Sequence, residues 1–192
     1  MPKKPKFSRE LLLQEAYAIA DAEGINEVSS RSIARNLGCS IQPIYTHFPT
    51  MAELRLETFR YASKQFTREL MSCRGEEDPF HWVMECTVDL ARNRPNLFKL
   101  IFLTGGFSSR SLPEAILDLV KCQKVIGKIM ELYDLSKEDS EDILVRCELF
   151  LLGVGTMLCS SHMAFSDAEI RKMTDRTVSD LVQGAKEGKK SS

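Results

Sequence analysis

The clearest chemical pattern in the chain lies between Ser29 and Phe48, in the stretch SSRSIARNLGCSIQPIYTHF. It predicts a short helix that is capped by the hydroxyl of Ser29 or Ser30. This helix ends at Gly38, because glycine adopts the left-handed C-terminal conformation at the lowest cost. Ser40 can then cap a second short helix that ends in aromatic residues. Two short helices joined by a glycine turn are typical of a helix-turn-helix, whose second helix enters the major groove of DNA.

The second helix of this motif carries the side chains that we expect to contact bases. Its first three positions are Ile41, Gln42 and Pro43, where proline is harmless because the N–H groups have no intrahelical partner. Gln42 can make a bidentate contact to adenine, and Ile41 or Pro43 can meet a thymine methyl group. Ile44 and Phe48, four residues apart, are expected to face the interior. The other residues of the predicted DNA-binding surface, chiefly for contacts to the phosphate backbone, are Ser29, Ser30, Arg31, Ser40, Tyr45, Thr46 and His47.

The charge of the chain is balanced overall but not locally. The sequence of 192 residues has 26 basic and 27 acidic residues, for a net charge of −1. This balance argues against a protein that binds nucleic acid by charge alone. From Val28 to Ala52, however, the chain has no carboxylate, and its charged or titratable side chains there are Arg31, Arg35 and His47. A surface cleared of negative charge within a neutral chain is typical of a specific reader of DNA.

Residues from about 7 to 62 resemble the DNA-binding domain of TetR/AcrR-family transcriptional regulators. The resemblance rests on four segments in this order: LLLQEAYAIADAEG, RSIARNLG, SIQPIYTHF and PTMAEL. Met51 stands where family members usually carry a lysine that helps to hold a phosphate, but Thr50 and Glu53 can still form a capping box there. The resemblance implies a DNA-binding transcriptional regulator, by family habit a repressor, that binds a palindromic operator as a homodimer and is released by a small-molecule effector.

The rest of the chain has many signals that begin or end helices and few that favour strands. We therefore expect an all-α protein of the TetR type. An N-terminal three-helix helix-turn-helix DNA-binding domain at 5–65 (motif 29–48) is followed by a larger ligand-binding and dimerisation domain at 66–192. The two are expected to join through a helix or a short loop near 60–65. The helices expected in the larger domain are Asp78-Pro79 to about Asn93, the segment NLFKLIFL, Ser111-Pro113 to about Leu132, one starting at Ser136 with Asp139, and one starting at a capping box of Ser166 with Glu169.

The segment from Leu149 to Ser166 has no charged residue, and LFLLGVGTMLC within it is nearly all apolar. A helix that is apolar around most of its circumference must be covered on more than one side. It is either a core helix of one subunit or one that also packs across a two-fold axis. The family resemblance implies dimerisation through the last two helices, at about 138–185, as a four-helix bundle. The residues assigned to this interface are Leu151, Gly153, Val154 and Leu158.

The same apolar segment is interrupted by hydroxyls and a histidine, at Thr156, Ser160, Ser161 and His162. A transmembrane helix needs about 20 predominantly apolar residues, so a membrane span is not expected. The N-terminus passes from lysines directly into an amphipathic helix, without the pattern of a signal peptide. We therefore expect a cytoplasmic protein without a membrane partner.

Between the two ends of the chain lies a region rich in aromatic residues and methionine. Ordinary core packing explains most of them, whereas the family resemblance implies a pocket for a small-molecule effector between these helices. Such a lining favours a hydrophobic or a cationic aromatic compound. The residues assigned to the pocket are Trp82, Phe98, Phe102, Phe107 and Met130.

The chain shows no motif for catalysis, metal binding or a cofactor. Its six cysteines are scattered without zinc-finger spacing, and the common hydrolase, phosphate-loop and metalloprotease motifs are absent. Cys39 lies in the turn of the helix-turn-helix, so control by thiol oxidation, or by a protein partner, is the alternative to a small-molecule pocket. A helical enzyme or adaptor that merely kept the motif is a third interpretation, against which the intact recognition helix argues.

Overall fold

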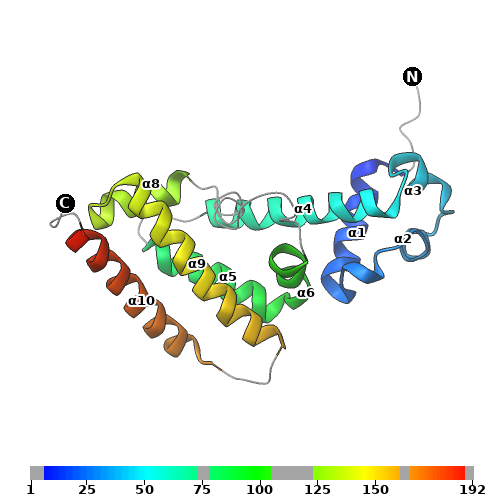
Figure 1. The fold of residues 1–192 in the computed structure, drawn as a ribbon. Coiled ribbons are helices and arrows are strands. Elements are labelled where there is room, and N and C mark those ends of the chain that lie inside the picture. The colour runs from blue at the N-terminus through cyan, green and yellow to red at the C-terminus, as the bar shows by residue number, and fades with distance from the viewer. Residues whose placement is uncertain (1–6, 73–77, 105–122, 161–164, 189–192) are drawn as a thin grey trace. The chain divides into compact units, whose positions relative to one another are not determined.

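The computed structural model describes residues 7–72, 78–104, 123–160 and 165–188 (Figure 1). Throughout these ranges the chain forms helices joined by turns, which confirms the all-α prediction. The chain divides into two compact units. The first contains residues up to 65 together with 94–106, and the second contains 66–93 together with the residues after 106.

The first unit is built around α1 (Arg9–Glu23), which packs against the short helices of the unit. Its core is formed by apolar side chains spaced along α1 and by those on the inward faces of the helices that follow. The core residues include Leu12, Ile33, Ile44 and Phe48, which are all 0% exposed. The other elements of this unit are η1 (Ile25–Glu27), α2 (Ser30–Leu37), α3 (Gln42–His47), the first part of α4 (Met51–Met71), α6 (Pro95–Phe98) and the π-helical turn η2 (Lys99–Leu103).

The second unit consists of the end of α4 with α5 (Pro79–Asn93), α8 (Gln123–Tyr133), α9 (Lys137–Ser160) and α10 (Asp167–Gly188). Helix α9 packs along α5 and also contacts α8 and α10 (Figure 1). On α9 the buried positions recur every three or four residues, as expected for one face of a helix turned to the core. These positions include Ile143, Leu144, Cys147, Glu148, Leu151 and Val154.

Most of the helix boundaries in the second unit are those that the sequence predicts. The Asp78 carboxylate accepts hydrogen bonds from the backbone N–H groups of Phe80 (2.9 Å) and His81 (3.2 Å), and α5 ends at Asn93 as expected. At the start of α9 the Ser136 hydroxyl accepts from the Asp139 N–H. Ser166 and Glu169 form the predicted capping box before α10. The predicted start at Ser111-Pro113 lies outside the described residues, and the described part of that helix ends at Tyr133.

Helix α4 runs from Met51 to Met71 without a break, and the division between the two units falls within it, after Gln65. Residues 94–104 were assigned to the larger domain on sequence grounds, whereas in the structure they group with the first unit. This segment begins at Arg94, directly after α5, and α6 packs on α1. The first unit is therefore assembled from two separate stretches of the chain.

Candidate nucleic-acid interface

The first helix of the motif, α2, begins at a capping box made by two serines. The Ser29 hydroxyl accepts from the Ser32 N–H (3.1 Å), and the Ser32 hydroxyl accepts from the Ser29 N–H (3.0 Å). The helix ends at Gly38, whose φ of 62° lies in the left-handed region, as the sequence predicts. The capping residue is therefore Ser29, while Ser30 is the first residue of the helix.

Helix α3 begins one residue later than the predicted serine cap allows. Its N-terminal flanking residue is Ile41, which has helical backbone angles, and no side chain caps the helix. The Ile41 carbonyl already accepts from the N–H groups of Ile44 and Tyr45. The prediction that Ser40 caps this helix is wrong, because the helical backbone at Ile41 places Ser40 before the flanking position.

The outward face of α3 is the surface that the sequence assigns to base contacts. Ile41 is 47% exposed and Tyr45 is 44% exposed, and Gln42 is also exposed, while Pro43 is half-buried. Ile44 and Phe48 are buried beneath them, as predicted, so burial of these two side chains fixes which face of α3 points outward. Arg31, Ser40 and Thr46 are exposed, and Ser29 is half-buried.

Several hydroxyl and imidazole groups of the predicted surface also bond within the unit. The Tyr45 hydroxyl lies 3.4 Å from that of Ser30, which is only 8% exposed, so this pair links α3 to α2. The Thr46 hydroxyl donates to the Gln42 carbonyl (2.9 Å). His47 is half-buried, and its Nε2 lies 3.1 Å from the Phe7 carbonyl oxygen. These bonds hold the short helix in place. Gln42, the first residue of α3, is exposed.

Helix α4 begins beside the motif and anchors the turn before α2. The Thr50 hydroxyl accepts from the Glu53 N–H (3.1 Å), which is one of the two bonds of the predicted capping box. The Arg55 guanidinium donates to the carbonyl groups of Val28 (3.3 Å) and Asn26 (3.2 Å). The start of α4, with Met51 at its first position, therefore lies on the same unit as α3.

An arginine that the sequence analysis did not single out ties residues 94–96 to the end of α1. The Arg94 guanidinium binds the Asp21 carboxylate through Nη2 (2.7 Å) and Nε (3.1 and 3.2 Å), and also donates to the Tyr17 hydroxyl (2.8 Å). The Asn96 amide donates to the Asp21 and Ala22 carbonyl groups. The carboxylate raises the pKa of Arg94, and burial raises the pKa of the Tyr17 hydroxyl. Because the partners lie more than 70 residues apart, no spacing in the sequence signals this cluster.

Replacement of Arg94 by alanine is expected to destabilise the first unit by about 1–3 kcal/mol, because several charge-assisted hydrogen bonds are lost and the Asp21 carboxylate is left half-buried. Hydrogen exchange of the α1 amides measures the effect. Arg92→Ala is the matched control, since Arg92 pairs with the much more exposed Asp167 and its loss should cost less than about 0.5 kcal/mol. Equal effects of the two variants on α1 would contradict the assignment.

The residues predicted to line an effector pocket are divided between the two units. Trp82 and Met130 are half-buried in the second unit, where the Trp82 indole N–H donates to the Leu70 carbonyl (3.0 Å). Phe98 and Phe102 are buried in the first unit with ring centroids 5.1 Å apart. Phe107 lies outside the described residues. The pocket therefore stays a prediction.

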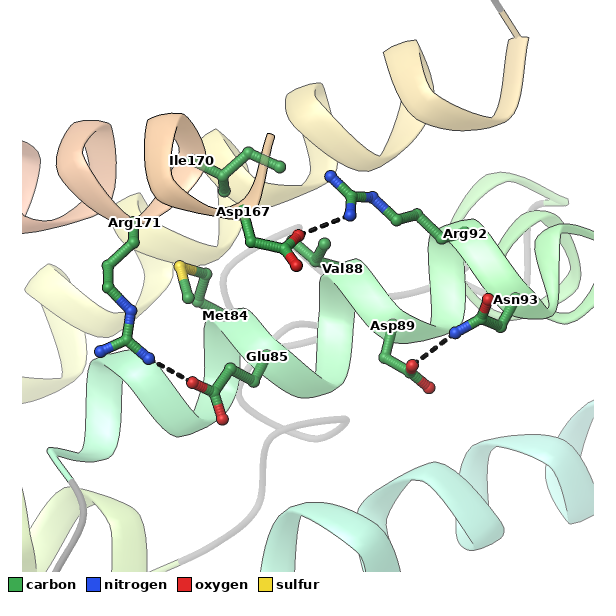
Figure 2. A pocket seen from close by; sticks show the side chains of 9 residues that line it. All are labelled: Met84, Glu85, Val88, Asp89, Arg92, Asn93, Asp167, Ile170 and Arg171. Atoms are coloured by element: carbon green, nitrogen blue, oxygen red, sulfur yellow. Dashed lines mark hydrogen bonds and ion pairs between the residues drawn. The ribbon is translucent and has the colours of Figure 1, made fainter. Parts of the chain in front are cut away.

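A groove of about 500 Å³ lies between α5 and α10 within the second unit (Figure 2). Met84, Val88 and Ile170 form its buried apolar wall. Its rim is charged, and Figure 2 shows two ion pairs that cross from one helix to the other, Arg92 with Asp167 and Arg171 with Glu85. A third pair, His81 with Asp175, lies further along the same two helices. Both arginines of the groove are thus already paired, so its rim serves to hold α10 on α5.

The predicted dimer residues fall on both faces of α9. Leu151 and Val154 are buried inside the subunit, at 1% and 6% exposure, whereas Gly153 is exposed and Leu158 is half-buried. An outward strip of the same helix, with a spacing of four residues, is formed by Leu149, Gly153 and Met157, of which the leucine is 41% and the methionine 44% exposed. On α10, half-exposed residues recur with the same spacing at Met173, Thr177 and Leu181.

By length and composition alone, α9 could cross a membrane, because its most apolar stretch has a mean hydropathy of 1.7. Of this stretch, 44% is buried inside the chain. Its contacts with α5, α8 and α10 are those of a partly buried core helix. Within the described residues, no group of three histidine, cysteine, aspartate or glutamate side chains could hold a metal ion. Cys39 is half-buried in the turn of the motif, while Cys86 and Cys147 are buried.

Solved structures share this fold at low sequence identity. The multidrug binding protein EbrR in complex with imidazole matches with a TM-score of 0.57 and 14% identity, over 90% of this chain and 96% of that chain. BioQ with its natural double-stranded DNA operator matches with a TM-score of 0.55 and 17% identity, over 93% and 99%. A TetR transcriptional regulator from Rhodococcus sp. RHA1 gives 0.52 and 18%, over 91% and 94%. No protein-family model and no curated protein matches the chain. The chain therefore has the fold of TetR regulators.

Proposed function

We propose that this chain is a DNA-binding transcriptional regulator that reads a palindromic operator as a homodimer and acts as a repressor that a small-molecule effector releases. The observation that carries the proposal is the outward face of α3. It exposes Ile41, Gln42 and Tyr45 over a buried Ile44 and Phe48, on a stretch from residue 28 to 52 that has no carboxylate. A short exposed helix without negative charge fits the major groove.

The roles within this surface follow from chemistry. Gln42 reads an adenine through its amide group, because a carboxamide can donate to N7 and accept from N6 at the same time. Tyr45, Thr46, His47 and the start of α2 contact phosphates and fix the register of the helix. The start of α4, which lacks a lysine at Met51, adds backbone N–H groups for a phosphate. BioQ, which shares the fold, was solved with its double-stranded DNA operator, and this supports a role of the chain in DNA binding.

A homodimer is proposed because one six-residue recognition helix makes too few contacts for specific binding. Two such helices about 34 Å apart can read the two halves of a palindrome. The outward strip of α9 (Leu149, Gly153 and Met157) together with the half-exposed residues of α10 is the surface that we assign to the interface. Leu151 and Val154 support it from inside the subunit.

Release by an effector requires that the effector prefer the conformation that does not bind DNA. A tenfold shift of this equilibrium takes about 1.4 kcal/mol of differential affinity. We place the effector among the helices of the second unit. The complex of EbrR with imidazole shows that a protein of this fold binds a small molecule.

Replacement of Gln42 by alanine is expected to relax the preference at one base pair of each half-site, with a loss of about 1–3 kcal/mol for the preferred base and little change for the others. Selection of binding sites from random duplexes measures this effect. Tyr45→Phe is the matched control, because it removes one hydroxyl of the same surface and should weaken all sites alike.

An unchanged base preference of Gln42→Ala would overturn the assignment of this residue. If the wild-type protein binds no DNA duplex in preference to random competitor DNA, the proposed function itself is overturned. Retention that falls steeply with salt concentration would support it.

A further inference from the structure

His47, the last residue of α3, joins this helix to the start of α1. Its Nε2 atom lies 3.1 Å from the carbonyl oxygen of Phe7, the residue before the N-terminal cap Ser8. Close by, the Arg9 guanidinium lies 4.7 Å from the centroid of the Phe48 ring. Two separate contacts thus hold the end of α3 against the start of α1, so the His47 ring is kept in one orientation.

The bond to Phe7 decides which nitrogen of the ring carries a proton. A carbonyl oxygen only accepts hydrogen bonds, so Nε2 of His47 must be the donor. In the neutral ring the other nitrogen, Nδ1, then has a lone pair and no proton. Within the described residues the side chain makes no other hydrogen bond or ion pair. Nδ1 is not one of the buried polar atoms that lack a partner, so it is accessible to solvent and to a partner outside the chain.

A neutral His47 is unsuited to the phosphate contact that we propose for it. A phosphate oxygen of the DNA backbone is negatively charged and only accepts hydrogen bonds. The lone pair on Nδ1 would face this oxygen without a proton between them, which is repulsive. With a second proton the ring is an imidazolium, both of its nitrogens donate, and Nδ1 can make a charge-assisted bond to the phosphate. A phosphate at this position therefore favours the protonated ring.

The groups around His47 leave the histidine as the side chain that responds to pH near neutrality. Residues 28 to 52 contain no carboxylate. On α4, Glu57 is bound by Arg60 (2.7 Å) and Arg9 (3.1 Å), and these hydrogen bonds lower the pKa of its carboxyl group. Histidine normally titrates between pH 5 and pH 8, whereas carboxyl, arginine, tyrosine and cysteine side chains normally titrate outside this range. The charged and titratable groups on the elements around α3 are Arg9 and Glu10 on α1, Arg31 and Arg35 on α2, Cys39 in the turn, Tyr45 on α3 itself, and Glu53, Arg55 and Glu57 on α4.

We propose that His47 binds a phosphate group of the DNA backbone as an imidazolium, so that each half of the dimer takes up a proton when it binds the operator. Nε2 stays bonded to the Phe7 carbonyl, and Nδ1 donates to the phosphate oxygen. The proton comes from solvent or buffer, and the N–H bond at Nδ1 is the only bond that forms. This inference rests on the proposed function and deepens it, because it makes operator binding sensitive to pH near neutrality.

Calorimetric titration of the full-length protein with the duplex that site selection recovers tests this proposal. Titrations at about pH 7 in buffers of different ionisation enthalpy are expected to show uptake of about 0.5–1 proton per half-site. The affinity for the duplex should correspondingly fall by about 10- to 100-fold between pH 6 and pH 8 at constant salt concentration.

His47→Gln separates the charge of the ring from its structural role. The amide nitrogen of glutamine can donate to the Phe7 carbonyl as Nε2 does, but this side chain takes up no proton. The variant should bind the duplex at pH 8 about as tightly as the wild type, without proton uptake and with most of the pH dependence lost. His81→Gln is the matched control, because it removes a histidine of the second unit and should keep both effects.

Replacement of single phosphates of the duplex by uncharged methylphosphonates locates the contact. At one position in each half-site, this replacement should remove most of the pH dependence of the wild-type protein. At pH 6 the same replacement should weaken His47→Gln much less than the wild type, since the variant has no imidazolium to lose its partner.

Specific binding of the duplex without proton uptake would overturn this inference and leave the proposed function standing. An undiminished pH dependence of His47→Gln would do the same. If the wild-type protein prefers no duplex over random competitor DNA at any pH from 6 to 8, the proposed function is refuted and this inference falls with it.

Discussion

Replacement of Gly153 by aspartate is expected to make the protein a monomer and to weaken operator binding by about 100-fold or more, because one recognition helix then has to bind without its partner. Gly153 is exposed on the outward strip of α9, and a Cβ atom placed there meets no neighbouring atom within 4 Å in the subunit. The substitution should therefore fold normally and act only where a second copy covers the strip. Sedimentation analysis and a DNA-binding titration measure the two effects.

Gly127 provides the matched control for this experiment. It is also an exposed helical glycine, on α8, and a Cβ atom there likewise has no neighbour within 4 Å. Gly127→Asp should remain a dimer with wild-type affinity for DNA. A Gly153→Asp protein that stays dimeric, or that binds the operator tightly as a monomer, would contradict the proposed interface.

The free energy of unfolding of the second unit is expected to fall by on the order of 4 kcal/mol as the pH rises from about 4.5 to above 8. Burial raises the pKa of Glu148 from its ordinary value of 4.5 to about 8, so the folded state holds a proton that the unfolded chain releases. Where the folded state binds more protons, stability decreases with increasing pH. The favourable contribution of the protonated group is complete below about pH 4.5 and is lost as the pH passes through 8.

Trp82 makes this measurement specific, since it is the single tryptophan of the chain and belongs to the second unit. Denaturant titrations followed by its fluorescence report unfolding of that unit. In Glu148→Gln the downward slope should vanish, and this variant should be more stable than the wild type at pH 9. In Glu85→Gln, which lacks an exposed carboxylate, the slope should remain. The same slope in Glu148→Gln as in the wild type would assign the pH dependence to other groups.

Local signals in the sequence predicted the local structure well. Ser29, Gly38, Asp78 and the pair of Ser166 with Glu169 mark helix ends correctly, because capping depends on residues within one turn of the helix. The prediction that Ser40 caps α3 is wrong for a reason that is equally local. The backbone at Ile41 is already helical, which moves the start of α3 by one residue.

The features that the sequence could not reveal depend on distant parts of the chain. The apolar run of α9 does not distinguish residues that fill the core, such as Leu151, from those that face outward, such as Leu149, because both faces are apolar. The cluster around Arg94 joins residues more than 70 positions apart. Glu148 alone had a readable signal, since it occupies a position in the same helical stripe as Leu144 and Leu151, where a charged residue is unexpected.

The pairing of residues 94–96 with α1 bears on how this protein can be divided. The segment 94–104 belongs to the first unit, and within it Leu97, Phe98 and Ile101 are almost completely buried. A fragment cut after residue 65 would lack the hydrogen bonds that Asn96 makes to the last carbonyls of α1, along with the Arg94 partner of Asp21. The N-terminal region is thus not complete by itself, and a fusion of it to another sensor domain has to include residues 94–104 as well.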